Sequence, residues 1–237
     1  MALILNLESS TEVCSVSLAK NGLLIDSIEN FEGQNHAKLL SVFTDDMINR
    51  NNLGFQQLDA VAISKGPGSY TGLRIGVSLA KGICYGNKIP LIAVNPLKAM
   101  AWHVAQNLEK YKLNDEPDLL LCPMIDARRM EVYTALYTSN LDEVDSVDAQ
   151  IIVEDSFVEK LAESKIVFFG NGSSKCSAQI TSPNAIFLDD VRTSAQFMCS
   201  LSNKAFENND FVNLAYFEPF YLKDFIAGIP KKNILKT

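Results

Sequence analysis

A glycine-rich segment at residues 65–76 is the first candidate for chemistry. It reads KGPGSYTGLRIG and places four glycines between an apolar run and a helical pattern. It lacks the spacing of a nucleoside triphosphate loop, Thr71 stands at the third glycine of a dinucleotide fingerprint, and Pro67 replaces the first glycine of a nucleophile elbow. Amide groups at the following helix start could still hold an anion, with candidate contacts at Gly68, Ser69 and Arg74.

Two groups of polar residues follow the ends of apolar strands. Glu8 ends the run LILNLE, and the hydroxyls of Ser9 and Ser10 come next. Glu8 and Ser10 could contact a ligand, or the carboxylate and hydroxyls could simply cap the hairpin. The second cluster is DARRME, residues 126–131. Its arginine pair could hold a carboxylate or phosphate, and the alternative is an exposed turn laced with ion pairs.

The chain has two histidines, His36 and His103. A metal site needs several ligands brought together, and Leu40 stands one helical turn after His36. Ser69 and Thr71 could serve as nucleophiles only with a base nearby, and neither histidine is well placed for that role. The sequence therefore does not favour an independent hydrolase, and His36 is interpreted as a helix-start or interface residue.

Strand and helix signals alternate along the first half. A meander of three strands is followed by a helix whose apolar residues recur at helical spacing, and then by a strand–helix–strand unit of the βαβ type. A proline opens the next helix. The expected strands are residues 3–9, 13–20, 23–30, 59–66 and 89–96, and the expected helices are 36–49, 71–86 and 97–108.

The second half begins with a strand pair that echoes the first. In both pairs an acid ends one apolar strand and another acid precedes the next, which predicts a structural duplication. The expected strands are residues 119–127, 131–138, 165–172 and 185–190, and the expected helices are 156–164 and 193–210, the latter capped by Thr193 or Ser194. We expect subdomains at residues 1–108 and 109–237, with the last helix returning to the first.

Composition limits the class of protein. The chain has 237 residues, 47% of them hydrophobic, and a formal charge of −7, which opposes free-standing nucleic-acid binding. Its five cysteines never stand in C-x-x-C spacing, no apolar run is long enough for a membrane helix, and no leader is evident. These features predict a cytoplasmic protein with reduced thiols and no membrane partner. The lysines among the last fifteen residues form a basic tail, interpreted as a solubilising terminus.

Several segments together resemble one family. GPGSYTGLRIGVSLAKG, with LILNLESST, NHAKLL, VNPLKAMA, IDARRMEVY and FEPFYLKD, is similar to the TsaB (YeaZ) family through most of the chain. The resemblance implies an α/β fold of the tandem duplicated actin-like and Hsp70-like ATPase class (ASKHA, ribonuclease H-like). It also implies a noncatalytic dimerization and activating subunit of the complex that installs threonylcarbamoyl on adenosine next to the anticodon, in tRNAs reading codons that begin with adenine. The alternative is a stand-alone ATP-binding hydrolase or kinase of the same fold.

The resemblance also implies partners. These are a TsaD-type paralogous transferase that carries the metal on an H-x-x-x-H helix, a TsaE-type ATPase, and tRNA reached indirectly through the complex; the isolated chain should form a homodimer. Here His36 lies in the similar region but Leu40 takes the second position, so no metal is expected. Glu8 stands where the family usually has Asp, and no glycine follows it. We therefore expect no cofactor of its own, with ATP or ADP at the complex interface as the remaining option.

Small residues in the helix after the glycine loop suggest close packing. One row is Gly72, Gly76 and Ala80, and the other is Ser78, Gly82 and Gly86. Helical glycine costs about 1 kcal/mol relative to alanine, so contact within the chain or with a partner should offset it. The predicted partner interface is His36, Leu39, Leu40, Phe43, Met47, Leu73, Gly76, Val77 and Ala80. A leucine at Gly76 is then expected to leave the fold nearly intact and to weaken partner binding.

Overall fold

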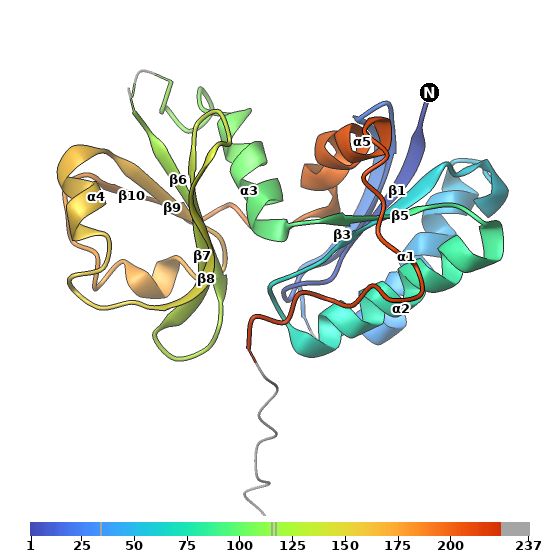
Figure 1. Cartoon of the computed structure of the whole chain (residues 1–237), viewed down its shortest axis with the longest axis horizontal. Helices are drawn as coiled ribbons and strands as arrows, with labels where there is room; N and C mark the ends of the chain where they lie inside the picture. Colours follow the sequence, from blue (N-terminus) through green and yellow to red (C-terminus); the bar gives the residue numbers. More distant parts are fainter. Residues whose placement is uncertain (34, 115, 117, 224–237) are drawn as a thin grey trace, which may run out of the picture.

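The computed structural model describes residues 1–33, 35–114, 116 and 118–223, and it consists of two halves side by side (Figure 1). Each half contains a five-stranded sheet, with the orders β3-β2-β1-β4-β5 and β8-β7-β6-β9-β10. In both sheets the first three strands along the chain pair antiparallel with one another in order, and the fourth and fifth strands join parallel. The expected duplication is therefore confirmed, because the two halves share one topology.

The first sheet is covered on both faces. Helices α1 (His36–Arg50) and α2 (Tyr70–Asn87) contact each other and lie over β2 and β4, while α5 (Cys199–Glu207) lies against β1 and β5 (Figure 1). Burial on both faces explains why the central strands read as continuous apolar runs. The strands are β1 (Leu3–Glu8), β2 (Cys14–Lys20), β3 (Leu23–Asn30), β4 (Ala60–Ser64) and β5 (Leu91–Val94).

The second sheet contains one strand that was not predicted. Strand β8 (Glu143–Ile151) pairs with β7 at the sheet edge. This edge strand is only partly buried. Its sequence, EVDSVDAQI, mixes apolar residues with polar, mostly acidic ones, so it lacks the continuous apolar run by which its neighbours were predicted. The other elements are β6 (Leu120–Asp126), β7 (Glu131–Thr138), α4 (Val158–Glu163), β9 (Ile166–Phe169) and β10 (Ala185–Leu188).

The two halves exchange helices. Helix α3 (Pro96–Ala105) follows the first sheet in sequence but packs on β6 and β7 of the second. The expected last helix is divided into a 3₁₀ turn, Ala195–Met198, and α5, and both return to the first sheet. Ser194 caps the turn by accepting a hydrogen bond from the Gln196 amide at 3.1 Å. The proposed boundary at residue 108 stays a prediction.

Residues 211–223, which we call the C-terminal strap, run from the first half towards the second (Figure 1). The strap bonds to strand β5 through Val212 N and Leu91 O at 3.0 Å, and to the glycine-rich loop through Phe220 N and Lys65 O at 2.7 Å. It ends in an ion pair between Lys223 and Glu131 of the second half. Most of the basic tail lies beyond, outside the described residues. None of the helices in the described ranges is both long and apolar enough to cross a membrane.

Candidate functional site

The glycine-rich loop packs tightly on the turn between β1 and β2. A Cβ added at Gly68 or Gly72 would overlap the carbonyl oxygen of Ser10 or Ser9, respectively. Ser69 donates its amide to Ser10 O at 2.7 Å, and its hydroxyl caps α2 by accepting from the Gly72 amide at 3.2 Å. The glycines therefore allow two backbones to approach closely, and Ser69 is a helix cap with its hydroxyl engaged.

Glu8 is fully buried beneath this loop. Its Oε1 accepts from the Ser10 amide at 2.6 Å, whereas Glu8 Oε2 and the hydroxyls of Ser9 and Ser10 have no hydrogen-bond partner within the described part of the chain. Burial raises the pKa of the Glu8 carboxyl, and the nearby Ser10, Ser64 and Ser9 groups oppose that shift by less. Glu8 and Ser10 are thus buried, Gly68 packs on the Ser10 carbonyl oxygen, and Ser69 and Arg74 are exposed. A nucleotide at these residues stays a prediction that the packing does not favour.

His36 is used for packing at the start of α1. Its Nε2 lies 3.1 Å from the carbonyl oxygen of Val13, so this nitrogen carries the proton and donates. Leu40, one turn later, is completely buried in the core. His103 stacks on Phe197 with ring centroids 3.8 Å apart, and burial lowers its pKa to about 4. Among the described residues, no three His, Cys, Asp or Glu side chains are grouped as metal ligands.

Most of the predicted partner-interface residues are buried within the chain itself. At Gly76 a Cβ would overlap Ser9 Oγ and lie 2.8 Å from Ile63 Cδ1. The expected exposure is therefore wrong, and a leucine at Gly76 would disturb the core. The reason is that the apolar stripes of α1 and α2 cover their own sheet, leaving Leu39 and Phe43 half-exposed. The buried members are His36, Leu40, Met47, Leu73, Gly76, Val77 and Ala80.

The second row of small residues is open. Gly82 and Gly86 are exposed, and a Cβ at either position would meet no atom within 4 Å. They belong to the outer side of α2 together with Ser78, Leu79 and Ile83. A shallow, largely apolar groove of about 310 Å³ lies there, lined by Phe55, Ser78, Leu79, Gly82, Ile83 and Asn87. The sequence contained this row but could not show which of the two rows faced outward.

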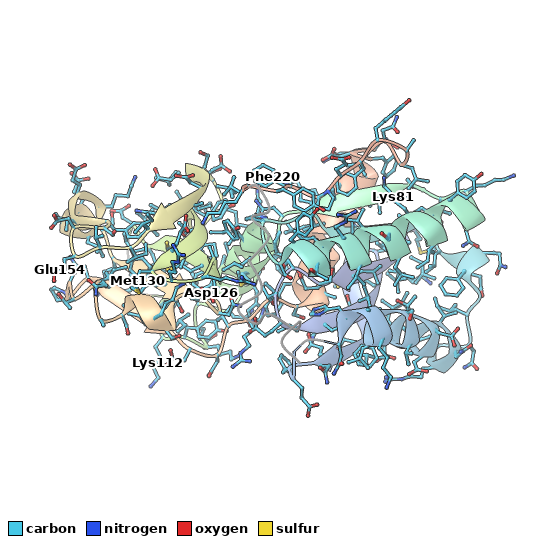
Figure 2. All side chains as sticks on the ribbon, turned by 90° about the horizontal axis from the view of Figure 1, so that it is seen from below. Lys81, Lys112, Asp126, Met130, Glu154 and Phe220 are labelled. Atoms are coloured by element: carbon cyan, nitrogen blue, oxygen red, sulfur yellow. The ribbon has the colours of Figure 1, made fainter. Side chains whose placement is uncertain are left out.

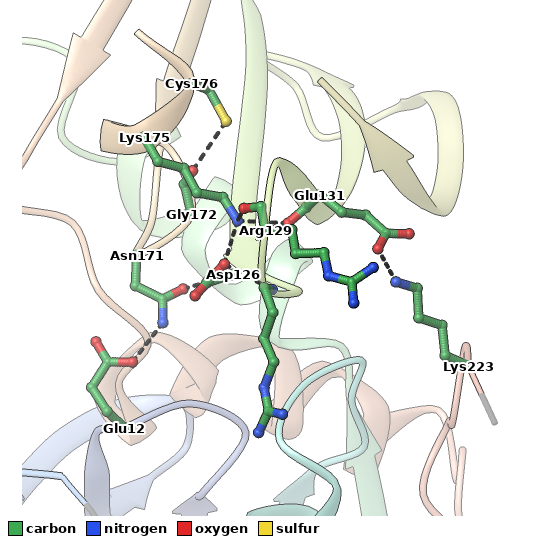
Figure 3. A network of polar contacts seen from close by, with 10 residues as sticks. Glu12, Asp126, Arg129, Glu131, Asn171, Gly172, Lys175, Cys176 and Lys223 are labelled. Carbon is green, nitrogen blue, oxygen red and sulfur yellow. Dashed lines mark hydrogen bonds and ion pairs between the residues drawn. The ribbon is translucent and has the colours of Figure 1, made fainter. Parts of the chain in front are cut away.

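The DARRME cluster forms the turn between β6 and β7, and lysines neutralise its acids. Lys175 pairs with Asp126, and Lys223 with Glu131 (Figure 3). Arg128 and Arg129 are exposed and form no ion pair within the described ranges. The turn is thus exposed and carries ion pairs, as the alternative expected, but these pairs involve its acids and not its arginines.

Residues far along the chain support this turn. Lys175 also donates to the carbonyl oxygens of Arg129 and Glu131, each at 2.7 Å. Asn171 accepts from the Asp126 amide at 3.0 Å and donates to Glu12 of the first half at 2.5 Å (Figure 3). Asn171 and Lys175 both lie in the loop after β9, in the segment GNGSSK. Neither residue was singled out from the sequence, where the glycines and polar residues of this segment indicate no more than a loop.

Known proteins match most of the chain. The profile of the family described as "TsaD: tRNA N6-adenosine threonylcarbamoyltransferase" matches residues 30–231. The "tRNA threonylcarbamoyladenosine biosynthesis protein TsaB" of Bacillus subtilis is 30% identical over 175 residues, covering 72% of each chain. The Haemophilus influenzae protein of that name is 27% identical over 230 residues, covering 93% of each.

Solved structures agree on the fold. The structure titled "YeaZ from Pseudomonas aeruginosa" superposes with a TM-score of 0.77 at 26% identity, covering 94% of this chain and all of that one. The fold is the α/β fold of the actin-like ATPase class, as expected. No match favours a stand-alone hydrolase or kinase. From its sequence, its duplicated sheets and these relatives, the chain belongs to the TsaB family of tRNA threonylcarbamoyladenosine biosynthesis proteins.

Proposed function

We infer that this chain is the noncatalytic dimerization and activating subunit of the complex that installs threonylcarbamoyl on adenosine next to the anticodon of tRNAs reading codons that begin with adenine. Membership of the TsaB family supports the pathway. The observation that carries the noncatalytic role is the use of the α1 start for packing. His36 Nε2 donates to a backbone carbonyl and Leu40 is buried where a second metal ligand would stand.

The partner surface is the outer side of α1 and α2. Gly82 and Gly86 let a partner helix approach the α2 backbone closely, and the adjacent groove supplies apolar contact. A TsaD-type paralogue with equivalent helices would complete a pseudo-symmetric bundle, and two copies of this chain would do so in its absence. We call this surface the α1–α2 face; its members are Leu39, Val42, Phe43, Ile75, Ser78, Leu79, Gly82 and Gly86.

Other components follow from the same role. A TsaE-type ATPase joins the complex, and tRNA reaches this chain within it. ATP or ADP, if bound, lies at the subunit interface, because the inner glycines are occupied by the turn of Ser9 and Ser10.

The test is transfer of labelled threonylcarbamoyl to unmodified tRNA. This chain alone, the transferase with the ATPase, and all three together are compared. Activity only in the full mixture supports a required noncatalytic subunit. Activity from this chain alone would show that it has a catalytic site of its own.

A variant tests the α1–α2 face. Gly82→Leu should fold, since nothing occupies the space around its Cβ, but it should weaken association with the transferase at least tenfold by calorimetry. Ala178→Leu, at an exposed position of the second half, is the matched control and should bind normally. Equal affinity of the two variants would place the interface elsewhere.

A further inference from the structure

The turn between β6 and β7 holds two arginines in an unfavourable backbone conformation. Arg128 has φ of 69° and Arg129 has φ of 53°, both in the left-handed region that favours Asn and Gly. Such strain persists only where surrounding contacts impose it, and it is concentrated at functional sites. A pair of residues ill-suited to the turn therefore points to a role for their side chains.

Contacts within the chain hold the backbone of this turn. The Asp126 carboxylate accepts from the Arg128 amide at 3.0 Å, and Lys175 holds Asp126 and two carbonyl oxygens of the turn (Figure 3). The acids are thus paired with lysines, and both guanidinium groups are left without a carboxylate in the described part of the chain. Two pre-positioned arginines suit phosphate, which accepts paired hydrogen bonds from each.

Aromatic rings lie between this charged turn and helix α2 of the first half. Lys223 at the end of the strap lies 5.9 Å above the Tyr133 ring, beside Glu131. Two residues earlier, the Tyr221 ring lies 4.8 Å from that of Tyr70. The Arg74 guanidinium is 5.3 Å from the Tyr70 ring centre and donates to its hydroxyl at 2.7 Å.

These contacts join both halves into one surface, which we call the arginine–tyrosine strip. Its members are Tyr70, Arg74, Arg128, Arg129, Tyr221 and Lys223. In Figure 2, Asp126 and Met130 mark the turn on the second half, and Phe220 marks the strap between the halves. The strip carries four cations and has three acids beside its members, Asp126, Glu131 and Glu218, in a chain whose formal charge is −7.

We propose that the arginine–tyrosine strip binds a single-stranded segment of tRNA, with the arginines on backbone phosphates and the tyrosines stacked on unpaired bases. Interleaved cations and aromatic rings are the recognition pattern for unpaired RNA, because every base offers a ring face and every linkage a charge. The local positive charge resolves the objection raised by the negative whole chain. This inference rests on the proposed function, which identifies tRNA as the RNA that the strip would bind.

The experiment measures binding of the full chain to a fluorescein-labelled anticodon stem–loop RNA by fluorescence anisotropy at several salt concentrations. The test variant is Arg128→Asn/Arg129→Gly, which places favoured residues at the left-handed positions and should melt at the same temperature or higher. It should weaken binding about tenfold and reduce the slope of log affinity against log salt by about two. Tyr221→Leu should weaken binding with the salt slope unchanged.

Two controls make the result specific. Lys204→Ala removes one exposed cation from helix α5, on the opposite face of the first sheet from α2, and should bind like the wild type. An RNA duplex of equal length should bind several-fold more weakly than the stem–loop. Equal loss in the turn variant and Lys204→Ala would overturn the proposal. Equal binding of duplex and stem–loop, or displacement of the RNA by ATP at equimolar concentration, would do so as well.

The transfer reaction separates the two hypotheses. In the full mixture the turn variant should raise the KM for tRNA with little change in kcat. An unchanged KM would overturn the strip while leaving the proposed function standing. Full activity without this chain would instead overturn the proposed function, whatever the RNA-binding result.

Discussion

Glu8 is a carboxyl group enclosed by the chain. Among the described residues, a hydrogen-bond partner is found for one of its two oxygens, and burial raises its pKa above the ordinary value of 4.5. The folded state therefore holds the proton more tightly than the unfolded state. Its contribution to stability is fully present below pH 4.5 and is lost as pH rises through the folded-state pKa.

Replacing Glu8 with glutamine should remove this loss. Glu8→Gln keeps the shape and an oxygen for the Ser10 amide but cannot ionise. We expect the variant to be more stable than the wild type at pH 8 and no more stable at pH 4, by urea unfolding at several pH values. Parallel pH profiles for the two proteins would show that Glu8 does not ionise within this range.

Helix α2 uses glycine for opposite purposes on its two sides. On the inner side Gly72 and Gly76 let the helix lie against the turn of Ser9 and Ser10. On the outer side Gly82 and Gly86 face open space, and the helix bears their conformational cost without contact inside the chain. Glycine at these outer positions weakens the helix, and a partner helix that packs directly on the α2 backbone would offset that cost.

Alanine at two positions in this helix should distinguish the sides. Gly76→Ala should destabilise the chain by about 1–3 kcal/mol, because its Cβ overlaps Ser9 Oγ and crowds Ile63. Gly82→Ala should stabilise it by about 0.5–1 kcal/mol through helix propensity. Denaturant unfolding of both variants under one set of conditions gives the comparison, and a loss of stability at Gly82 would contradict its open environment.

The two halves are joined by polar contacts as well as by exchanged helices. Thr11 and Thr193 hydroxyls meet at 2.6 Å with both residues buried, and Glu12 bonds to Asn171 at 2.5 Å. The returning 3₁₀ turn bonds to strand β2, where the Ala195 amide donates to Ser15 Oγ at 2.7 Å. Buried hydrogen bonds of this kind define one arrangement of the halves, because any other leaves polar groups unpaired.

Thr193→Val tests this seam at nearly constant volume. The change removes the Thr193 partner of the buried Thr11 hydroxyl, which still accepts from the Val13 amide at 3.2 Å, and should cost about 1 kcal/mol of unfolding free energy. Scanning calorimetry should show one lowered transition if the halves unfold together. Two separate transitions would mean that the seam couples the halves only weakly.

The fold could be predicted closely from the chain because its signals are local. Buried parallel strands read as apolar runs, helices showed their period, and Pro96 begins α3 and Ser194 caps the 3₁₀ turn as their residue types indicate. Strand β8 was missed because its acidic alternation resembles a loop. Most residues of the predicted interface were expected to be exposed but are buried. The sequence could not show this, because an apolar helical stripe looks the same whether a sheet or a partner covers it.

Some features of the candidate site could likewise be predicted from the sequence, and others depend on the fold. Sequence alone established the duplicated α/β class, the glycine-rich loop, the DARRME turn and the leucine one helical turn after His36, since each depends on residue types at short spacing. Folding established which glycines are enclosed, that lysines neutralise the acids of the turn, and that Tyr70 meets Tyr221. These contacts join segments separated by tens of residues or more, so they follow from packing between elements, which no local pattern specifies.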